Sequence, residues 1–321
     1  MKNKIAEIVR LQNRFGLYTH TKPDGDALGS LLALGLALEK LGKSVHYCSE
    51  GMPSLDFLPG YAKLEAEACH DVDVIIYVDC ANCERNALQT SAARDERNFP
   101  PPMIINIDHH ISNTQFGDVY WIDPASSSVG EMLWFLFEEM GITVDYDMAM
   151  NLYTSIVTDT GRFAFYNTTR RTHEVAGRLL ETGIEVGPLH TRLFDEKTLP
   201  QIKLLAQALN GLYLTGEGRI AVMGLKNEDF TRLGLDSNSS EGFIQMAMDI
   251  EGVQAAVLLK ESEPGVLKVS LRSRGQIDVN WLASQFGGGG HVRAAGCTLR
   301  MPFDQGTALV QTAILQMLDE I

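Results

Sequence analysis

Two short apolar segments that each end in an aspartate constrain the fold of this chain most strongly. Val74–Asp79 reads VIIYVD, and Met103–Asp108 reads MIINID. Continuous apolar runs of this length are typical of strands that are buried on both faces of a parallel sheet. Because helical patterns alternate with such runs through the first half of the chain, we predict an α/β fold with a mostly parallel sheet.

The first half also contains weaker strand patterns, helical patterns and a capping box, in which Ser128 precedes Glu131 by three residues. A helix is expected from this capping box to about Met140. The remaining elements predicted for this half are strands at Leu17–His20 and Val45–Cys48, and helices at Ala27–Leu41 and Tyr146–Thr158.

The second half has a different pattern, in which predicted strands are mixed with helices from Gly211 onward. Residues 183–200 show little periodicity and are expected to lead into a connecting helix. We place the domain boundary near residue 195. The prediction is a first domain over residues 1–190, a connecting helix or linker over 191–210 and a smaller α/β domain over 211–321, with strands at Ile220–Leu225, Gln254–Leu259 and Val266–Leu271.

The formal net charge of the chain is −14. Proteins that grip duplex DNA usually present a broad basic face, so no duplex DNA partner is expected. A small anionic substrate held by a few arginines fits better, and short single strands fit if the basic groups cluster. No apolar run reaches about 18 residues, and the first ten residues lack a signal-type core, so we expect a cytoplasmic protein without a membrane span.

Five cysteines in a chain of 321 residues do not form the pattern of a disulfide framework. Cys80 and Cys83 make a lone C-x-x-C. Because a second such pair is missing, we interpret them as ordinary reduced cysteines beside a strand end rather than as a metal or redox motif.

The segment His20-Thr-Lys-Pro-Asp24-Gly-Asp26 places a histidine and two acids directly after a predicted strand. Its proline and glycine favour a tight turn, from which both carboxylates could point at neighbouring cations. Helix N-terminal amides near Asp26 would also suit a phosphate. The same residues fit a simple Asp-Gly turn with a helix N-cap acid, and this stretch alone does not separate the two interpretations.

Acids and histidines recur where the two strongest strand patterns end. Asp79 closes the first pattern, and Asp108-His109-His110 closes the second. Ligands of parallel α/β sheets bind at the carboxyl edge, so these groups are expected to converge there. Asp159 lies near a predicted helix C-terminus, where the helix dipole disfavours an acid, and a bound cation would explain its presence.

Together these motifs supply two histidines and four carboxylates. Two divalent ions that share one carboxylate would use all six groups, and such ion pairs catalyse phosphoryl displacement. The mixture of imidazole and carboxylate suits Mn²⁺ better than Mg²⁺, and Co²⁺, Fe²⁺ and Zn²⁺ also accept these donors. The sequence therefore predicts metal-assisted hydrolysis of a phosphoester, with the ligands His20, Asp24, Asp26, Asp79, His109 and Asp159.

In their order along the chain, these motifs resemble the four motifs of the DHH phosphoesterase superfamily. The later segment Gly287-Gly-Gly-Gly-His291-x-x-Ala294-Ala-Gly296 resembles the hallmark of the DHHA1 domain of this family. By length, the chain is most similar to the bacterial nanoRNase and pAp phosphatase group, which degrades very short oligoribonucleotides and dephosphorylates 3′-phosphoadenosine 5′-phosphate. The resemblance implies an active site in the cleft between a DHH domain and a DHHA1 domain.

The resemblance also implies catalytic roles for three residues. Asp79 would bridge the two ions, His110 would contact the scissile phosphate, and Asp108 would orient a histidine without touching a metal. The ions would be held by two sets of ligands, namely His20, Asp24 and Asp79 for one, and Asp26, Asp79, His109 and Asp159 for the other.

In the second domain, the resemblance implies a substrate-binding surface. Arg272 and Arg274 follow a predicted strand, and arginine binds phosphate through two N–H groups at once. Gly287–Gly290, before His291, are expected to form a flexible loop that allows close approach, in which backbone N–H groups could surround an anion, although four glycines also occur in plain linkers. The expected substrate-binding residues of this domain are Arg272, Arg274, Gly288, Gly289, Gly290 and His291.

Three arginines of the first domain complete the set of candidates. Arg162 either reaches a substrate phosphate or pairs with an acid, and the sequence supports both interpretations equally. Arg170 and Arg171 are expected on a solvated helix start.

Short single-stranded RNA and small nucleotides are thus the expected partners. Within the same chemistry, a cyclic or linear dinucleotide phosphodiesterase is the nearest alternative. From a different class, a metal-dependent nucleotide sensor would bind without cutting, but such a protein could lose a metal ligand and none is missing here. Apolar faces on the later helices are compatible with a homodimer.

Overall fold

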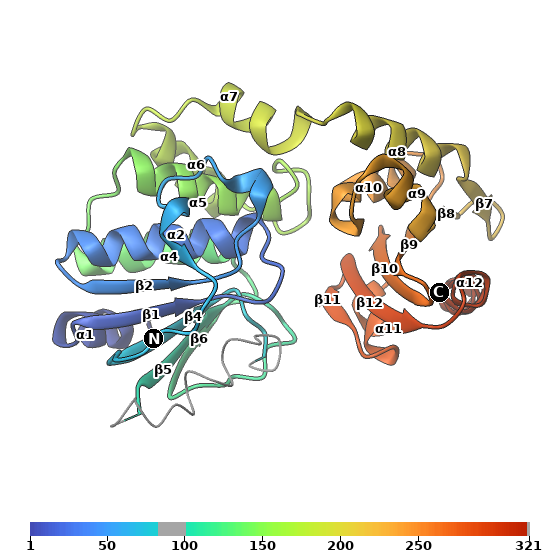
Figure 1. Cartoon of the computed structure of the whole chain (residues 1–321). Helices are drawn as coiled ribbons and strands as arrows, with labels where there is room; N and C mark the ends of the chain where they lie inside the picture. The colour runs from blue at the N-terminus through green and yellow to red at the C-terminus, as the bar shows by residue number, and fades with distance from the viewer. Residues whose placement is uncertain (83–100, 320–321) are drawn as a thin grey trace. The chain divides into compact units, whose positions relative to one another are not determined.

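The structure is a computed structural model that describes residues 1–82 and 101–319. The chain divides into two compact units, residues 1–195 and 196–321, which we describe separately (Figure 1). Of the helices in the described ranges, none is long and apolar enough to span a lipid bilayer.

The first unit is built on a six-stranded sheet in the order β3-β2-β1-β4-β5-β6. Every neighbouring pair in it runs parallel, which confirms the predicted α/β architecture. The strands are β1 (Arg14–Tyr18), β2 (Ser44–Cys48), β3 (Leu64–Glu65), β4 (Val74–Val78), β5 (Met103–Asp108) and β6 (Val119–Ile122).

Helices of the first unit pack over one face of this sheet (Figure 1). Helix α2 is apolar around most of its circumference because it lies between the sheet and α5. The helices are α1 (Lys2–Leu11), α2 (Gly25–Lys40), α4 (Val129–Met140), α5 (Tyr146–Asp159), α6 (Arg170–Leu180) and α7 (Val186–His190).

Strand residues alternate between the two faces of the sheet, as the pleat of a strand requires. Phe15 and Leu17 of β1 point into the main core beneath the helices. Tyr18 of the same strand points to the opposite face, where it joins a smaller cluster with Ile75 and Tyr77 of β4. Burial on both faces explains why β4 and its neighbours appear in the sequence as continuous apolar runs.

Some predicted boundaries in the first unit were wrong. The strand predicted at Leu17–His20 begins earlier and ends at Tyr18, so His20 lies in the loop after β1. The segment of low periodicity contains the short helix α7 and then leads into a helix, as expected. The capping box is only half formed, because Ser128 caps α4 whereas the Glu131 side chain binds elsewhere.

The second unit has a six-stranded sheet in the order β11-β12-β10-β9-β8-β7. The pair β8 and β9 runs parallel, and the other pairs run antiparallel. The three strands predicted here are present, although β9 and β10 extend beyond the predicted ends. The strands are β7 (Tyr213–Thr215), β8 (Ile220–Leu225), β9 (Ala255–Glu263), β10 (Val266–Ser273), β11 (Gly289–His291) and β12 (Ala294–Arg300).

Helices cover both faces of the second sheet with two separate apolar cores. Residues of α11 and α12 belong to one core, and residues of α8 and α10 belong to the other. The helices are α8 (Leu199–Asn210), α9 (Asn227–Leu233), α10 (Phe243–Met248), α11 (Val279–Gln285) and α12 (Phe303–Asp319).

The glycine-rich segment of the second unit is not a loop throughout, which corrects the sequence-based interpretation. Gly289 and Gly290 lie on strand β11, which pairs with β12. A Cβ atom at Gly288 would lie 2.1 Å from the Gly296 carbonyl oxygen, and one at Gly290 would lie 2.4 Å from that of Ala294. Close approach of the chain to itself therefore requires glycine at these positions.

Candidate metal centre

The loops after three neighbouring strands carry the first group of candidate residues. Strands β1, β4 and β5 lie side by side and parallel, so their carboxyl ends meet at one edge of the sheet. His20 follows β1, Asp79 follows β4 directly, and His109 follows β5 directly. This is the edge at which open α/β sheets bind their ligands, as the sequence predicts.

Asp24 and Asp26 enter the same region from the start of α2. Asp24 is the N-cap of this helix, and one of its oxygens accepts a hydrogen bond from the Ala27 N–H at 3.0 Å. The structure thus confirms the simpler interpretation of the sequence, in which this acid caps a helix. Capping engages only Oδ1 in this way, and a carboxylate has a second oxygen with which to bind a cation.

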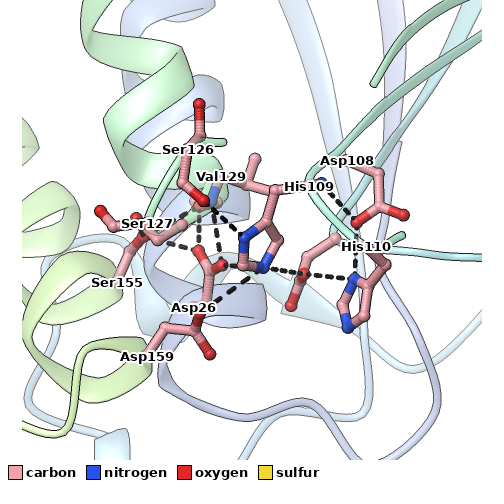
Figure 2. A network of polar contacts seen from close by, with 12 residues as sticks. Asp26, Asp108, His109, His110, Ser126, Ser127, Val129, Ser155 and Asp159 are labelled. Carbon is pink, nitrogen blue, oxygen red and sulfur yellow. Dashed lines mark hydrogen bonds and ion pairs between the residues drawn. The ribbon is translucent and has the colours of Figure 1, made fainter. Parts of the chain in front are cut away.

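Asp26 is buried, and both of its carboxylate oxygens accept hydrogen bonds. Its Oδ2 accepts from the Val129 N–H at 2.9 Å, and its Oδ1 accepts from the Ser155 and Ser30 hydroxyls at 2.6 and 2.9 Å. Val129 is the first residue of α4, so the partial positive charge of that helix start supports the carboxylate (Figure 2). These donors hold Asp26 in one orientation.

Close approach of α2 to α5 brings these donors within reach. A Cβ atom at Gly29 of α2 would lie 2.5 Å from the Asn151 carbonyl oxygen of α5. Only glycine allows the two helices to come so near. Ser155, which lies one turn further along α5, then reaches the Asp26 carboxylate.

All six predicted metal ligands fall into two clusters within the first unit. In each cluster, every residue offers one ligand atom, and these atoms lie within 4.8 Å of one another. A third cluster in this unit joins Asp79 with Asp108 and His110. The two ligand clusters are His20 with Asp24 and Asp79, and Asp26 with His109 and Asp159.

His20 and His109 are oriented in the same way. Nδ1 of His20 lies 2.9 Å from the Thr21 carbonyl oxygen, and Nδ1 of His109 lies 3.2 Å from that of Ser126. A carbonyl oxygen only accepts, so each Nδ1 is the donor. Nε2 of each ring therefore faces the carboxylates, which is the arrangement of histidines that bind metal.

The spacing between Nε2 of His109 and its three carboxylate neighbours fits an ion between them. The distances are 3.5 Å to Asp26, 3.6 Å to Asp79 and 3.6 Å to Asp159. These are too long for hydrogen bonds. Ligand atoms that each bind one ion at about 2.1 Å lie roughly 3.0 to 3.4 Å apart, so small adjustments would accommodate a divalent cation here.

Asp79 occupies the centre of the arrangement. Its Oδ2 lies 3.6 Å from Nε2 of His20, and its Oδ1 lies 3.6 Å from Nε2 of His109. Oδ1 is buried and accepts no hydrogen bond among the residues that the structure describes. An unsatisfied buried carboxylate oxygen is costly, and a metal ion would satisfy it. The two oxygens face different histidines, which suits the predicted bridging role.

His110 and Asp108 form a separate hydrogen-bonded pair. Nδ1 of His110 donates to Oδ1 of Asp108 at 2.7 Å, and the backbone N–H of His109 donates to the same oxygen at 2.8 Å. Asn113 donates to the other oxygen of Asp108. Asp108 thus contacts Nδ1 of His110 and places no oxygen in either ligand cluster. The orienting role that the resemblance implies for it stays a prediction.

The pKa values show that this site attracts cations. Burial and the nearby charge of Asp79 raise the pKa of Asp26, and burial raises the pKa of Asp159 to about 6. Burial opposes protonation of His20 and His109, yet their acidic neighbours raise the pKa of each to about 10. Burial opposes ionisation of Asp79 as well, but the neighbouring histidines, His20 first among them, lower its pKa. Protons on both histidines would give way to a bound metal.

The loops that carry the ligands hold several side-chain-bearing residues in left-handed backbone conformations. The φ angle is 55° at Lys22, between His20 and Asp24, and 54° at Asp79 itself. It is 62° at Arg162, which follows Asp159 in the chain. Such conformations are strained for residues other than glycine and cluster at functional sites.

Arg162, Arg170 and Arg171 of the first unit each have an acidic partner. Arg162 lies 3.5 Å from Asp195 and stacks over the Phe194 ring at 4.3 Å, which supports the acid-pairing interpretation. Arg170 is exposed and pairs with Glu174, as expected for a solvated helix start. Arg171 also lies at the start of α6 and is partly exposed, but its guanidinium pairs with the buried Glu131, which the sequence did not predict.

The C-x-x-C segment is only partly described. Cys80 is buried, and its thiol donates to the Asn82 carbonyl oxygen at 3.1 Å. Cys83 lies outside the described residues.

Two substrate-binding candidates of the second unit share one row of its sheet. Arg272 of β10 and His291 of β11 are both paired with Ala294 of β12. Side chains that face each other across strands lie on the same side of a sheet, so Arg272 and His291 point the same way, about 10 Å apart. Arg274 lies just beyond the end of β10.

Several residues of the site were missed in the sequence analysis. Ser30 lies four residues after Asp26 on α2, and this spacing could have identified it as a partner. Ser155, Asn113 and Asn167 carry no such signal. Asn167 donates to the Asp159 carboxylate at 3.3 Å, a contact made by a loop residue beyond the end of α5.

Two family matches cover most of the chain. Residues 14–156 match the DHH family, N-terminal domain, and residues 217–320 match the DHHA1 domain. The bifunctional oligoribonuclease and PAP phosphatase NrnA of Thermus thermophilus is 32% identical over 319 residues, which cover 98% of this chain and 93% of that protein. NrnA of Bacillus subtilis is 30% identical over 305 residues, 93% of each chain.

Two further similarities concern the alternative function and the fold. The cyclic-di-AMP phosphodiesterase PdeA of Listeria monocytogenes is 24% identical over 314 residues, which cover 92% of this chain and 46% of that protein. The crystal structure of an exopolyphosphatase-related protein from Bacteroides fragilis has a TM-score of 0.88 at 23% identity and covers 98% of this chain and 95% of its own. It therefore has the same fold.

Proposed function

The chain belongs to the DHH family and is a hydrolase, and we propose that it is a two-metal phosphoesterase of small nucleotides. Its substrates would be short oligoribonucleotides, cut to mononucleotides, and 3′-phosphoadenosine 5′-phosphate, converted to AMP. The observation that carries this proposal is the pair of ligand clusters on either side of Asp79. Similarity to two bifunctional oligoribonuclease and PAP phosphatase proteins supports the choice of substrate.

Divalent ions fit the donors present at this site. Nε2 of His20 and of His109 face carboxylates at distances too long for hydrogen bonds, and the buried Oδ1 of Asp79 has no hydrogen-bond donor among the described residues. When bound, the ions would supply Lewis-acid stabilisation of the phosphoryl oxygens and a nucleophile at neutral pH. Mn²⁺ is the proposed ion, because imidazole and carboxylate donors occur together.

The remaining polar residues would position and protonate the substrate. Nδ1 of His110 donates to Asp108, which directs the other ring nitrogen away from this carboxylate. Nε2 of His110 would then bind a phosphate oxygen of the substrate. Asp108 stabilises the positive charge that His110 gains when it is protonated, since the pKa of His110 is raised by this hydrogen bond despite burial.

The second unit would bind the part of the substrate that is not cut. Arg272 and His291 share one row on one face of its sheet. A phosphate bound between two side chains about 10 Å apart would receive donors from both. Arg274, Arg162 and the backbone N–H groups of Gly288, Gly289 and Gly290 are further proposed substrate contacts.

A second candidate function is hydrolysis of cyclic or linear dinucleotides. The similarity to a cyclic-di-AMP phosphodiesterase favours it, and the proposed chemistry would be the same. The two oligoribonuclease and PAP phosphatase relatives have the higher identity, and 93% of each is covered against 46% of the cyclic-di-AMP phosphodiesterase, which favours the first candidate.

A substrate panel tests the proposal. Purified protein with Mn²⁺ is incubated with 3′-phosphoadenosine 5′-phosphate, a labelled RNA dinucleotide, an RNA five-mer and cyclic di-AMP, with Asp79→Asn as the inactive control. We expect turnover of the first three and little of the fourth. Preference for the cyclic substrate would support the second candidate function. Absence of turnover for every substrate would overturn both.

A further inference from the structure

Residues 126–130 contact both deeply buried ligands of one metal cluster. The Ser126 carbonyl oxygen accepts the Nδ1–H of His109 at 3.2 Å. The backbone N–H groups of Val129 and Gly130 donate to the Asp26 carboxylate at 2.9 and 3.4 Å. One short segment, which we name the 126–130 segment, thus fixes the ring of one ligand and the carboxylate of another (Figure 2).

The same segment reaches the third ligand of that cluster through one asparagine. The side-chain amide of Asn167 donates to the Ser127 carbonyl oxygen at 2.9 Å. It also donates to the backbone carbonyl and the carboxylate of Asp159, at 3.1 and 3.3 Å. The position of the 126–130 segment therefore affects Asp26, His109 and Asp159, which make up one complete cluster.

A buried glutamate holds this segment from behind. Glu131 is fully buried and accepts hydrogen bonds from the Ser127 hydroxyl at 2.6 Å and from the Thr172 hydroxyl at 2.8 Å. The Nε–H group of Arg171 donates to the same carboxylate. Nη2 of Arg171 lies 2.9 Å from the Ser126 hydroxyl oxygen, so one guanidinium contacts both Ser126, which precedes α4, and Glu131, in the first turn of that helix.

The ligands of the other cluster are oriented by different contacts. His20 donates to the carbonyl oxygen of Thr21, its neighbour in the chain. Asp24 accepts from Ala27 at the start of α2. These contacts are local to the loop after β1 and to the first turn of α2, and they do not depend on α6 or on Arg171.

We propose that Arg171 and Glu131 are positioning residues for one metal site only, the site of Asp26, His109 and Asp159. This inference rests on the proposed two-metal function. The ion pair fixes the 126–130 segment, which in turn sets the direction of Nε2 of His109 and of the Asp26 carboxylate. Groups that orient metal ligands typically change metal affinity by about 10- to 100-fold when they are removed.

Binding of Mn²⁺ to chelator-treated protein tests the proposal without reference to catalysis. Electron paramagnetic resonance measures free Mn²⁺ during a titration and gives the spectrum of the bound ions. Arg171→Ala is compared with wild type and with Arg170→Ala, which removes a neighbouring arginine whose ion pair with Glu174 is exposed. Asp159→Asn and Asp24→Asn serve as references, because each removes a ligand of one cluster.

We expect Arg171→Ala to keep one Mn²⁺ at near wild-type affinity and to bind the second roughly 10- to 100-fold more weakly. The spectrum of its first bound ion should match that of Asp159→Asn, and Arg170→Ala should behave as wild type. The proposal is overturned if both sites weaken equally, if neither changes, or if the spectrum matches that of Asp24→Asn. Wild-type protein that binds fewer than two Mn²⁺ would contradict the two-metal function instead.

Removal of Arg171 leaves a buried carboxylate without its cation, so the variant could unfold. Ser127→Ala avoids this problem, because it removes one donor to Glu131 and keeps the ion pair and the Ser127 carbonyl. We expect a loss at the same Mn²⁺ site of about 2- to 10-fold, as for one hydrogen bond. Thermal unfolding confirms that each variant is folded, and an unchanged second site in folded Ser127→Ala and Arg171→Lys would also overturn the proposal.

Discussion

The Ser126 carbonyl oxygen accepts the Nδ1–H of His109, and this one backbone contact directs Nε2 of the ring toward three carboxylates. No substitution of the Ser126 side chain can remove a carbonyl. The orientation of His109 therefore depends on the groups that fix the backbone near Ser126. Arg171 is one of them, through its contact with the Ser126 hydroxyl. Residues outside the metal site thus determine its geometry.

Replacement of Asp108 should impair catalysis and leave the metal ions in place. Asp108→Asn removes the charge that orients His110, so kcat should fall by about 100- to 10,000-fold, the range for a positioned acid or base. Mn²⁺ affinity should stay within about threefold of wild type, since Asp108 belongs to neither ligand cluster. Steady-state kinetics and Mn²⁺ titration measure the two effects. Asp118→Asn, directly before β6, is the control. Loss of Mn²⁺ from Asp108→Asn would contradict the assigned role.

Mn²⁺ affinity should rise with pH. Without metal, the pKa values of His20 and His109 are about 10, so both rings hold a proton at neutral pH that must leave before Nε2 can bind an ion. Low pH favours the protonated rings, and apparent affinity should fall by up to about tenfold per pH unit for each proton released. Below pH 6, protonation of Asp159 should weaken binding further.

Calorimetric titration with Mn²⁺ at pH 6.5, 7.5 and 8.5, in two buffers of different ionisation enthalpy, counts the protons released. Affinity that does not change over this range, or binding without proton release, would show that His20 and His109 are not ligands.

Alanine at Gly288 should destabilise the second unit. The new Cβ atom would meet the Gly296 carbonyl oxygen, and we expect a loss of about 2 to 3 kcal/mol in the free energy of unfolding. Gly287→Ala is the matched control, because its φ of +70° is strained but no atom lies within 4 Å of the new methyl group, and it should cost about 1 kcal/mol. Urea unfolding measures both. Normal stability of Gly288→Ala with a specific loss of nucleotide turnover would favour an anion-binding role for the glycines.

Substitutions of Arg272 and His291 should lower the turnover of a nucleotide more than that of a small aryl phosphodiester. Arg272→Ala and His291→Ala should each lower kcat/KM for 3′-phosphoadenosine 5′-phosphate by about 10- to 100-fold, the value of one charge-assisted hydrogen bond. A small aryl phosphodiester lacks the second phosphate that these side chains are proposed to bind, so its turnover should change little. Arg300→Ala, on the same sheet, is the control. Equal losses on the two substrates would argue against a separate substrate-binding surface.

The convergence of the proposed metal ligands could be predicted from the sequence because the carboxyl ends of parallel strands lie at one edge of a sheet. Asp79 and Asp108 close apolar runs, and those runs became neighbouring strands in the structure. Local pattern was sufficient here, since both the strand and the acid that ends it lie within six residues. The same logic placed His20 correctly even though the predicted end of its strand was wrong.

Contacts between distant helices could not be predicted in this way. Ser155 is 129 residues from Asp26, and Arg171 is 40 residues from Glu131. Each pair meets because whole helices pack against one another, and the local sequence pattern of one segment does not predict which residue it will contact. The glycines before His291 were misinterpreted for a related reason, because the atoms they avoid belong to strand β12.

The left-handed backbone at Lys22, Asp79 and Arg162 affects which residues selection should keep at these positions. Glycine at Lys22 or Arg162 would relieve strain of about 1 to 3 kcal/mol per residue, so selection for thermal stability alone would favour it. The same change would loosen a loop that carries a ligand. Where selection acts on the rigidity of the site, we expect larger side chains to be retained at these positions. A variant with glycine at one of them should be more heat-stable and have a lower turnover rate.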